Sequence, residues 1–129
     1  METMLSEEST CPFCGPEADC VFLDDALVKS FWDAYSVSPG HALIAPKRRV
    51  ETWFGATAEE RAAMIEAIER VKEIIEREHK PTAYNIGINS GRDAGQTVPH
   101  LHLHVIPRYP GDVEDPRGGI RNILPAKAR

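Results

Sequence analysis

The sequence is poor in the features that mark several classes of protein. Its three cysteines among 129 residues, an odd and low number, argue against the disulfide framework of a secreted domain. No apolar run approaches the roughly 20 residues that a membrane span needs, and the acidic N-terminus lacks the apolar core of a secretory signal. The net charge of −5 gives no basic surplus of the kind that nucleic-acid-binding proteins carry. We therefore expect a cytoplasmic protein that binds neither nucleic acid nor membranes.

The length of the chain suits one domain, and its 42% hydrophobic and 27% charged residues are ordinary for a globular protein. Residues 1–10 are polar and predict a flexible leader. Residues 11–110 hold the periodic segments and predict the folded domain. Residues 111–129 are rich in proline and glycine and predict an irregular C-terminal tail.

The periodic segments predict five strands and one long helix. Residues 57–78 have apolar side chains at helical spacing, and Thr57 with Glu60 matches a capping box at the helix start. Short apolar or alternating runs predict the strands, at residues 21–23, 26–33, 41–45, 83–89 and 100–106. Because the links between strands are short except across the helix, we expect an α+β fold with one antiparallel sheet and the helix on one face.

Three of the five histidines alternate with aliphatic residues in the last predicted strand, at His100, His102 and His104. Side chains on a strand alternate between faces, so the three imidazoles should line one face at intervals of about 6.5–7 Å. The alternating aliphatic residues Leu101, Leu103 and Val105 should point to the other face and can enter the core. A chance run of structural histidines is the alternative to a shared function.

Two chemistries suit such a row of imidazoles. His100 with His102 or His104 could bind a catalytic metal such as zinc, with an open position for substrate. Alternatively, one imidazole attacks phosphorus while the others orient it or move protons. The preceding residues 89–98 offer amide, hydroxyl and backbone N–H donors, which suit phosphate oxygens. Such donors are poor partners for a metal-bound imidazole, so the segment favours the phosphorus chemistry.

Residues 95–106, G-Q-T-V-P-H-L-H-L-H-V-I, resemble the signature of the histidine triad family. Residues 31–33 and 40–47 resemble further landmarks of that family, and the likeness covers residues 11–108. The G-Q-T-V wording with Pro107 and Arg108 is similar to the fragile-histidine-triad branch and to bacterial dinucleoside polyphosphate hydrolases. The resemblance implies a five-stranded antiparallel sheet with one long helix and a short helix packed on it. It also implies a homodimer.

The same resemblance implies an enzyme that cleaves at the α-phosphate of dinucleoside polyphosphates through a nucleotidyl-histidine intermediate. His102 would attack phosphorus, and His104 would bind a phosphate oxygen. His100 would hold the local network or a metal. Gln96 would position the leaving group and then the water. A dinucleotide phosphorylase, a nucleoside phosphoramidase, a nucleotide-binding regulatory module and a metal-dependent hydrolase remain alternatives.

The resemblance further implies which residues hold the nucleotide substrate. Asp33 would bind the ribose hydroxyls, and Asn89 would contact ribose or phosphate. Gly95 and Thr97 would donate to phosphate, while His41 would support the triad. Each has a structural alternative, because Asp33 could cap a strand end, His41 could be an ordinary buried histidine, and Asn89 and Thr97 could be turn residues.

A structural zinc ion is a further implication of the resemblance, while the chemistry itself is expected to need no cofactor. Cys11 and Cys14 resemble the zinc pair of many bacterial relatives, in which the first triad histidine, here His100, is another ligand. The remaining ligand position holds Arg49, which is always protonated and cannot bind zinc. Cys20 or water would have to replace it. The alternative is a pair of reduced cysteines packed near the sheet.

Overall fold

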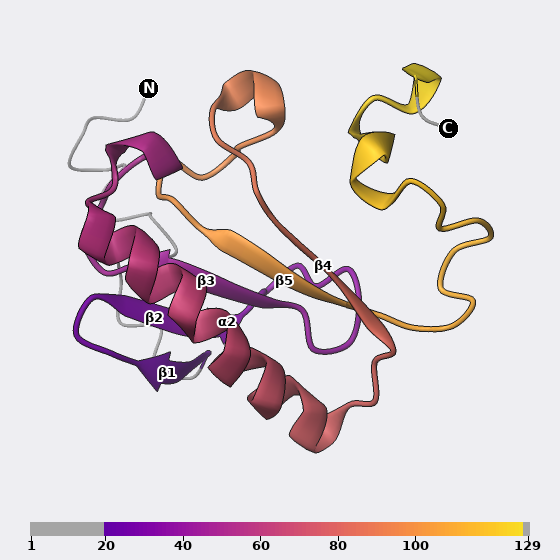
Figure 1. Cartoon of the computed structure of the whole chain (residues 1–129), viewed down its shortest axis with the longest axis horizontal. Coiled ribbons are helices and arrows are strands. Elements are labelled where there is room, and N and C mark those ends of the chain that lie inside the picture. The colour runs from indigo at the N-terminus through magenta and orange to yellow at the C-terminus, as the bar shows by residue number, and fades with distance from the viewer. Residues whose placement is uncertain (1–19, 128–129) are drawn as a thin grey trace.

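The computed structural model describes residues 20–127, which form one five-stranded antiparallel sheet and one long helix (Figure 1). The order across the sheet is β1-β2-β3-β5-β4, so the last strand along the chain lies inside the sheet. The elements are β1 (Val21–Asp24), β2 (Val28–Trp32), β3 (Ala42–Pro46), α2 (Ala58–Glu78), β4 (Ala83–Ile88) and β5 (Leu103–Arg108). The predicted α+β fold is confirmed. The predicted leader, Cys11 and Cys14 lie outside the described residues.

Within residues 20–127, α2 is the only α-helix. The other helical segments are 3₁₀ turns, η1 (Trp53–Gly55), η2 (Arg92–Ala94), η3 (Gly119–Ile123) and η4 (Pro125–Lys127). The short helix expected beside the long one is therefore not an α-helix in this part of the chain. No helix in the described residues is long and apolar enough to cross a membrane.

The start of α2 is set by the predicted capping box. The Thr57 hydroxyl accepts from the Glu60 N–H at 3.0 Å, and the Glu60 carboxylate accepts from the Thr57 N–H at 2.9 Å. These bonds satisfy two N–H groups that have no partner inside the helix. Further along, α2 buries Met64, Val71 and Ile75 against one face of the sheet, where they meet the main core. Figure 1 shows α2 lying across that face.

The opposite face of the sheet carries His104. Cross-strand pairing puts Phe31, Leu43, His104 and Gly87 in one row, since each is the partner of the next in register. The neighbours of His104 along β5, Leu103 and Val105, point to the helix side and are fully buried in the main core. His104 therefore lies on the face that α2 leaves uncovered.

The predicted strand at 100–106 is wrong at its start. The strand β5 begins at Leu103 and runs on to Arg108, so that it includes Pro107. The Leu101 N–H donates to the Val50 carbonyl at 2.7 Å, and the His100 N–H bonds locally to the Val98 carbonyl at 2.8 Å. These bonds take the backbone before residue 103 out of the ladder, so only His104 of the three histidines belongs to a strand.

Candidate active site

His102 is buried, and a backbone carbonyl fixes its ring. Its Nδ1 lies 2.8 Å from the His100 carbonyl oxygen, which can only accept a hydrogen bond. A neutral His102 therefore carries its proton on Nδ1 and its lone pair on Nε2. Burial lowers the pKa of His102 below its ordinary value, and this keeps the ring neutral at pH 7. The tautomer and the charge state both suit an Nε2 nucleophile.

His100 is held in the same way by a different segment. Its Nε2 lies 2.8 Å from the Pro46 carbonyl at the end of β3, so the proton of a neutral His100 is on Nε2. Burial lowers its pKa, and the positive charges of Lys29 and Arg49 lower it further. His100 thus links the end of β3 to His102. Its ring donates a hydrogen bond to the Pro46 carbonyl, and its own carbonyl accepts one from His102 Nδ1–H.

His41 and His104 form a directed pair beside these rings. The Val37 N–H donates to His41 Nδ1 at 3.1 Å, so a neutral His41 carries its proton on Nε2. That nitrogen lies 3.0 Å from His104 Nδ1, which accepts the hydrogen bond. His104 is then left with its own proton on Nε2, as a donor. Burial, together with charge repulsion from His102 and His41, lowers the pKa of His104 to about 4.

Asp33 follows β2 and lies beside His41. One carboxylate oxygen is 3.3 Å from His41 Nε2, and the other accepts from the Tyr35 N–H at 2.8 Å. The second contact is a turn at the end of the strand, which was one of the two interpretations of Asp33. The first contact places a negative charge against His41, where burial of the ring outweighs it and still lowers the His41 pKa.

The side chain of Gln96 fastens the loop that precedes the histidines. Its carbonyl oxygen accepts from the Gly91 N–H at 2.8 Å, and its amide nitrogen donates to the Glu51 and Val98 carbonyls at 2.7 and 3.0 Å. In this structure the amide therefore contacts backbone, although the resemblance implied a role at the leaving group. The next residue, Thr97, is exposed at the same loop.

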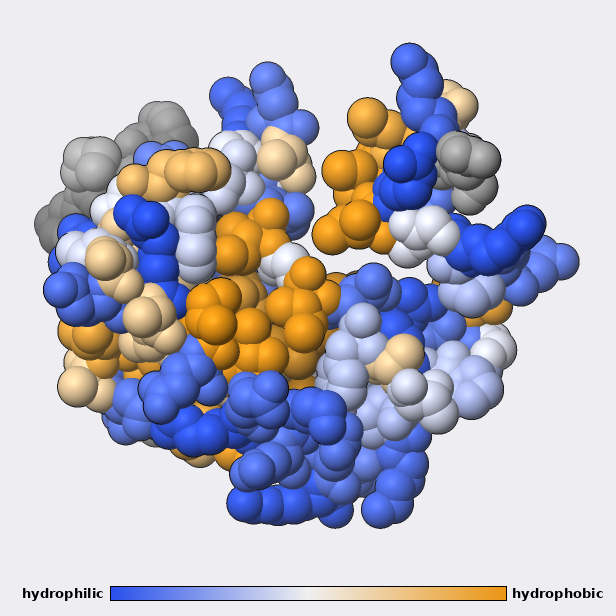
Figure 2. Space-filling model, in the orientation of Figure 1, coloured by the Kyte–Doolittle hydropathy of each residue, from blue (hydrophilic) through white to orange (hydrophobic). Residues whose placement is uncertain are grey.

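A cavity of about 810 Å³ opens in front of His104. It lies between the β4–β5 half of the sheet and the C-terminal segment that contains η3 and η4. His41 and Asn89, two of the expected substrate-binding residues, line it together with His104. Figure 2 shows this side as an open cleft with apolar side chains on both walls. The size is within the range of sites that hold a nucleotide-sized ligand.

Comparison with known proteins decides the family. The model of the HIT domain matches residues 16–111. This chain belongs to the HIT family. A HIT family protein from Bacillus anthracis has a solved structure that superimposes with a TM-score of 0.74 at 33% identity, over 81% of this chain and 77% of that one. The predicted membership and the predicted HIT-like sheet and helix are both confirmed.

Two relatives whose names state an activity are longer than this chain. A Schizosaccharomyces pombe protein named bis(5′-nucleosyl)-tetraphosphatase (asymmetrical) is 37% identical over 100 residues, which are 78% of this chain and 55% of that protein. A Mycobacterium tuberculosis protein named AP-4-A phosphorylase is 32% identical over 102 residues, or 78% of this chain and 52% of that protein. The chain thus spans about half the length of these two relatives.

Zinc occurs in at least one HIT structure, that of a zinc-bound histidine triad family protein from Mycobacterium smegmatis. It is 30% identical with a TM-score of 0.71, over 81% of this chain and 79% of that one. In the present chain, Arg49 acts on His100 as a nearby positive charge. A guanidinium at this place disfavours a second cation beside His100. The expected cysteine ligands are not among the described residues.

A second group that could hold a metal ion consists of Asp33, His41 and His104, whose donor atoms all lie within 4.8 Å of one another. A metal on His41 Nε2 would have to displace the proton that the Val37 contact assigns to this nitrogen. That proton could not move to Nδ1, because Nδ1 already faces the Val37 N–H. The contacts of this HIT chain therefore favour a hydrogen-bonded network at these three residues.

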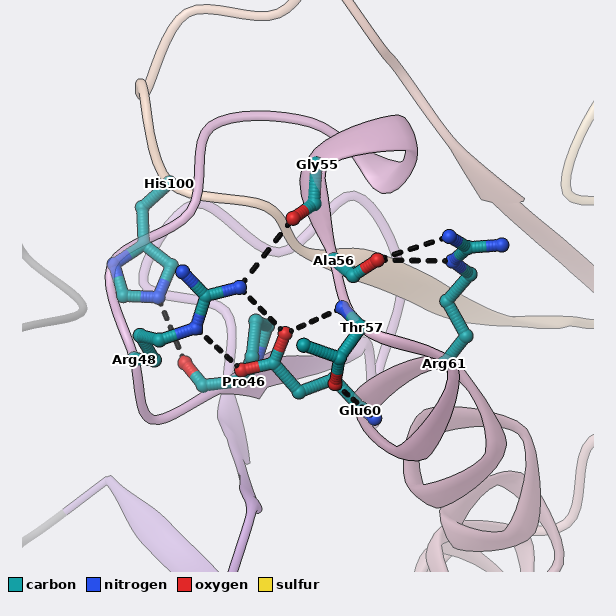
Figure 3. Close-up of polar contacts among 8 residues, drawn as sticks. All are labelled: Pro46, Arg48, Gly55, Ala56, Thr57, Glu60, Arg61 and His100. Carbon is teal, nitrogen blue, oxygen red and sulfur yellow. Dashed lines mark hydrogen bonds and ion pairs between the residues drawn. The ribbon is translucent and has the colours of Figure 1, made fainter.

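Sequence reasoning missed an ion pair between Arg48 and Glu60, which lies next to the Pro46 carbonyl and His100 (Figure 3). Glu60 is only 4% exposed, and both of its oxygens accept from the Arg48 guanidinium at 2.9 Å. These bonds hold the pKa of Glu60 at about 2. Arg48 follows Pro46, whose carbonyl orients His100. The capping box pointed to Glu60, but no signal in the sequence paired it with Arg48.

Proposed function

We propose that this chain is a nucleotide hydrolase that cleaves dinucleoside polyphosphates at the α-phosphate, with His102 as the nucleophile. The observation that carries the proposal is the bond from His102 Nδ1 to the His100 carbonyl. It leaves the lone pair of a neutral, buried imidazole on Nε2, which is what attack on phosphorus requires. The names of the Schizosaccharomyces pombe and Mycobacterium tuberculosis relatives supply the substrate class.

The reaction has two steps. First, His102 Nε2 forms a bond to the α-phosphorus while the bond from that phosphorus to the bridging oxygen breaks. The leaving nucleotide takes the electron pair and then a proton from water, and a nucleoside monophosphate remains on the ring. Second, water attacks the same phosphorus and gives up a proton to solvent, which replaces the proton taken in the first step, while the P–N bond breaks and its electron pair returns to His102. His104 Nε2–H donates to a phosphate oxygen in both steps, since His41 keeps its proton on that side.

The test is intact-protein mass spectrometry after a rapid quench with diadenosine tetraphosphate. We expect a transient nucleotidyl adduct on the wild type that maps to His102 and is absent from His102→Ala. The variant should lose several orders of magnitude in rate. His79→Ala, at the end of α2, is the matched control and should keep the adduct. Equal product formation by wild type and His102→Ala would remove His102 as nucleophile.

Two further arms separate the alternatives. Complete loss of activity in chelator, restored by added metal, would support the metal-dependent mechanism and contradict ours. Release of AMP and ATP without phosphate marks a hydrolase, whereas phosphate-dependent release of ADP and ATP would mark a phosphorylase like that named in Mycobacterium tuberculosis. Tight nucleotide binding without either product would indicate a regulatory module.

A further inference from the structure

The loop between β2 and β3, residues 33–41, carries the amide that directs His41, and its middle part is exposed. The Val37 N–H donates to His41 Nδ1 at 3.1 Å. Residues 34–37 are exposed, and the side chains of Tyr35 and Val37 are 88% and 72% exposed. A segment with so few buried side chains is not held in one position by packing. Other contacts must therefore keep the Val37 amide in place.

Two hydroxyl groups tie this loop to the C-terminal end of β5. The Ser38 hydroxyl donates to the Pro107 carbonyl at 2.7 Å, and the Tyr109 hydroxyl donates to the Pro39 carbonyl at 2.6 Å. The partners are 69 and 70 positions apart in the sequence. Figure 1 shows the loop beside this end of the strand. Each of the two segments thus contributes one hydroxyl and one carbonyl to the link.

The two bonds lie where the strand pairing has stopped. The ladder between β3 and β5 ends at the pair of Ala42 and Val105, so it fixes only the base of the loop. In the part of the chain that the structure describes, no backbone hydrogen bond joins residues 34–40 to residues 106–109. The two hydroxyl groups therefore supply the hydrogen bonds that the ladder does not.

A small movement of the loop would be enough to release His41. Val37 is next to Ser38, so a shift at this anchor passes through one peptide unit to the amide. Hydrogen bonds weaken steeply when their geometry departs from the optimum. Without the Val37 donor, the His41 ring can carry its proton on Nδ1, or turn its Nε2–H toward Asp33, whose carboxylate oxygen lies 3.3 Å away. In either case, Nδ1 of His104 loses the donor that it faces at 3.0 Å.

We propose that Ser38 and Tyr109 are positioning residues for the reaction. They hold the loop on the end of β5, which keeps the Val37 N–H on His41 and so fixes the nitrogen at which His104 donates. The inference deepens the proposed function and rests on it for the role of His104. The hydrogen bond to His41 Nδ1 can be measured without any substrate, so the two can fail separately.

The experiment removes one hydroxyl group at a time. Ser38→Ala and Tyr109→Phe each delete one link, and Ser38→Thr keeps a hydroxyl at the loop. Ser36→Ala is the matched control for serine, because the Ser36 hydroxyl donates to the Asp33 carbonyl inside the same loop, at 2.7 Å. Tyr35→Phe is the control for tyrosine, because Tyr35 is 88% exposed. Urea unfolding establishes that each variant is folded.

The first measurement is ¹⁵N NMR of protein with labelled histidines, without substrate and at a slightly alkaline pH that keeps the rings neutral. Protonated and unprotonated ring nitrogens have separate ¹⁵N shifts, and an unprotonated nitrogen also shifts when it loses a hydrogen bond. The spectrum of His41→Gln identifies the His41 signals. We expect Ser38→Ala and Tyr109→Phe to change the Nδ1 signal of His41. Ser38→Thr and both controls should keep the wild-type signal.

The second measurement is steady-state kinetics with diadenosine tetraphosphate. A less well directed His104 loses an interaction that is strongest in the transition state, so kcat should fall while KM changes little. We expect Ser38→Ala and Tyr109→Phe to lower kcat by about three- to tenfold, roughly the value of one hydrogen bond, with KM within about twofold of wild type. Ser38→Thr should recover most of the rate, and the controls should stay within about twofold.

Several results would overturn the inference. One is an unchanged His41 Nδ1 signal in both Ser38→Ala and Tyr109→Phe, whatever their rates. Another is an equal change in Ser38→Ala and Ser36→Ala, because the tie to β5 would then not be what matters. A changed signal with an unchanged kcat, or with a rise in KM alone, would also overturn it. If the wild type shows the expected signals but cleaves no diadenosine tetraphosphate, the proposed function fails and the hold of the loop on His41 stands.

Discussion

Nε2 of His41 lies 3.0 Å from Nδ1 of His104, although 63 positions separate the two residues in the chain. The direction of this bond is set by Val37, whose N–H occupies the other nitrogen of His41. His41 must then donate, and His104 must accept at Nδ1 and donate at Nε2. A backbone amide at the end of a turn thereby determines which nitrogen of His104 carries a proton and can donate.

The first prediction concerns this directed pair. His41→Leu removes the donor and lets His104 adopt either tautomer, so kcat/KM should fall about tenfold, the value of one hydrogen bond. His41→Gln keeps an N–H that can reach His104 and should recover part of the loss. Steady-state kinetics on folded variants checks both. If the leucine and glutamine variants are equally impaired, His41 acts through packing alone.

The second prediction is a loss of stability in mild acid. The pKa of His104 is about 4 in the folded protein and about 6.5 in the unfolded chain. Between these values the unfolded state binds more protons, so the free energy of unfolding falls as the pH drops from about 6.5 to 4. Urea unfolding at a series of pH values measures the slope. His104→Gln should reduce the slope and leave the part that His41, His100 and His102 contribute. An unchanged slope in that variant would contradict the assignment to His104.

The third prediction concerns the carboxylate of Glu60. Glu60→Ala removes half of the capping box and leaves Arg48 without its partner, so the free energy of unfolding should fall by about 2 kcal/mol. Thr57→Ala should cost about 1 kcal/mol. Glu59→Ala, in the same helix turn but exposed, is the control and should stay within about 0.5 kcal/mol. Thermal unfolding measures all three. Similar losses for Glu59→Ala and Glu60→Ala would refute the role of the ion pair.

The fourth prediction compares two glycines with the same backbone strain. Gly40 and Gly111 have φ of 86° and 77°, so alanine is strained at both, by about 1 kcal/mol or more. A Cβ at Gly40 would also lie 3.0 Å from the His79 ring and 3.2 Å from Ile75, whereas at Gly111 nothing lies within 4 Å.

Gly40→Ala should therefore destabilise by about 1–2 kcal/mol more than Gly111→Ala. Denaturant unfolding of the two variants gives the difference directly. Because Gly40 precedes His41, the alanine variant should also lose activity, and Gly111→Ala should not. Equal destabilisation would mean that the side chains around Gly40 move aside at no cost.

Local signals in the sequence were enough to predict the framework. The capping box at Thr57 predicted the helix start to within a residue. The alternation of Leu101, Leu103 and Val105 with the histidines correctly predicted that the three aliphatic residues enter the core. These features depend on neighbours a few positions away, so spacing alone carries them.

Contacts between distant segments could not be predicted in this way. The strand boundary at Leu103 depends on a hydrogen bond from Leu101 to Val50, and the position of Gln96 depends on the Glu51 carbonyl. The pairing of Asp33 with His41 also arises only once β2 and β3 are aligned. Each involves a backbone group whose position the tertiary fold sets, and the residue types alone do not encode it.

The interior place of β5 in the sheet determines when the histidines can meet. It is the last strand along residues 20–127, yet it pairs with both β3 and β4. During synthesis the segment with His41 emerges before the segment with His104. The β3 edge that faces β5 therefore stays unpaired until β5 is available. The imidazole pair therefore cannot form before β5 pairs with β3. A chain that stopped short of residues 100–108 would have His41 and Asp33 but neither His102 nor His104, so the whole imidazole network depends on the segment that joins the sheet from the far end of the sequence.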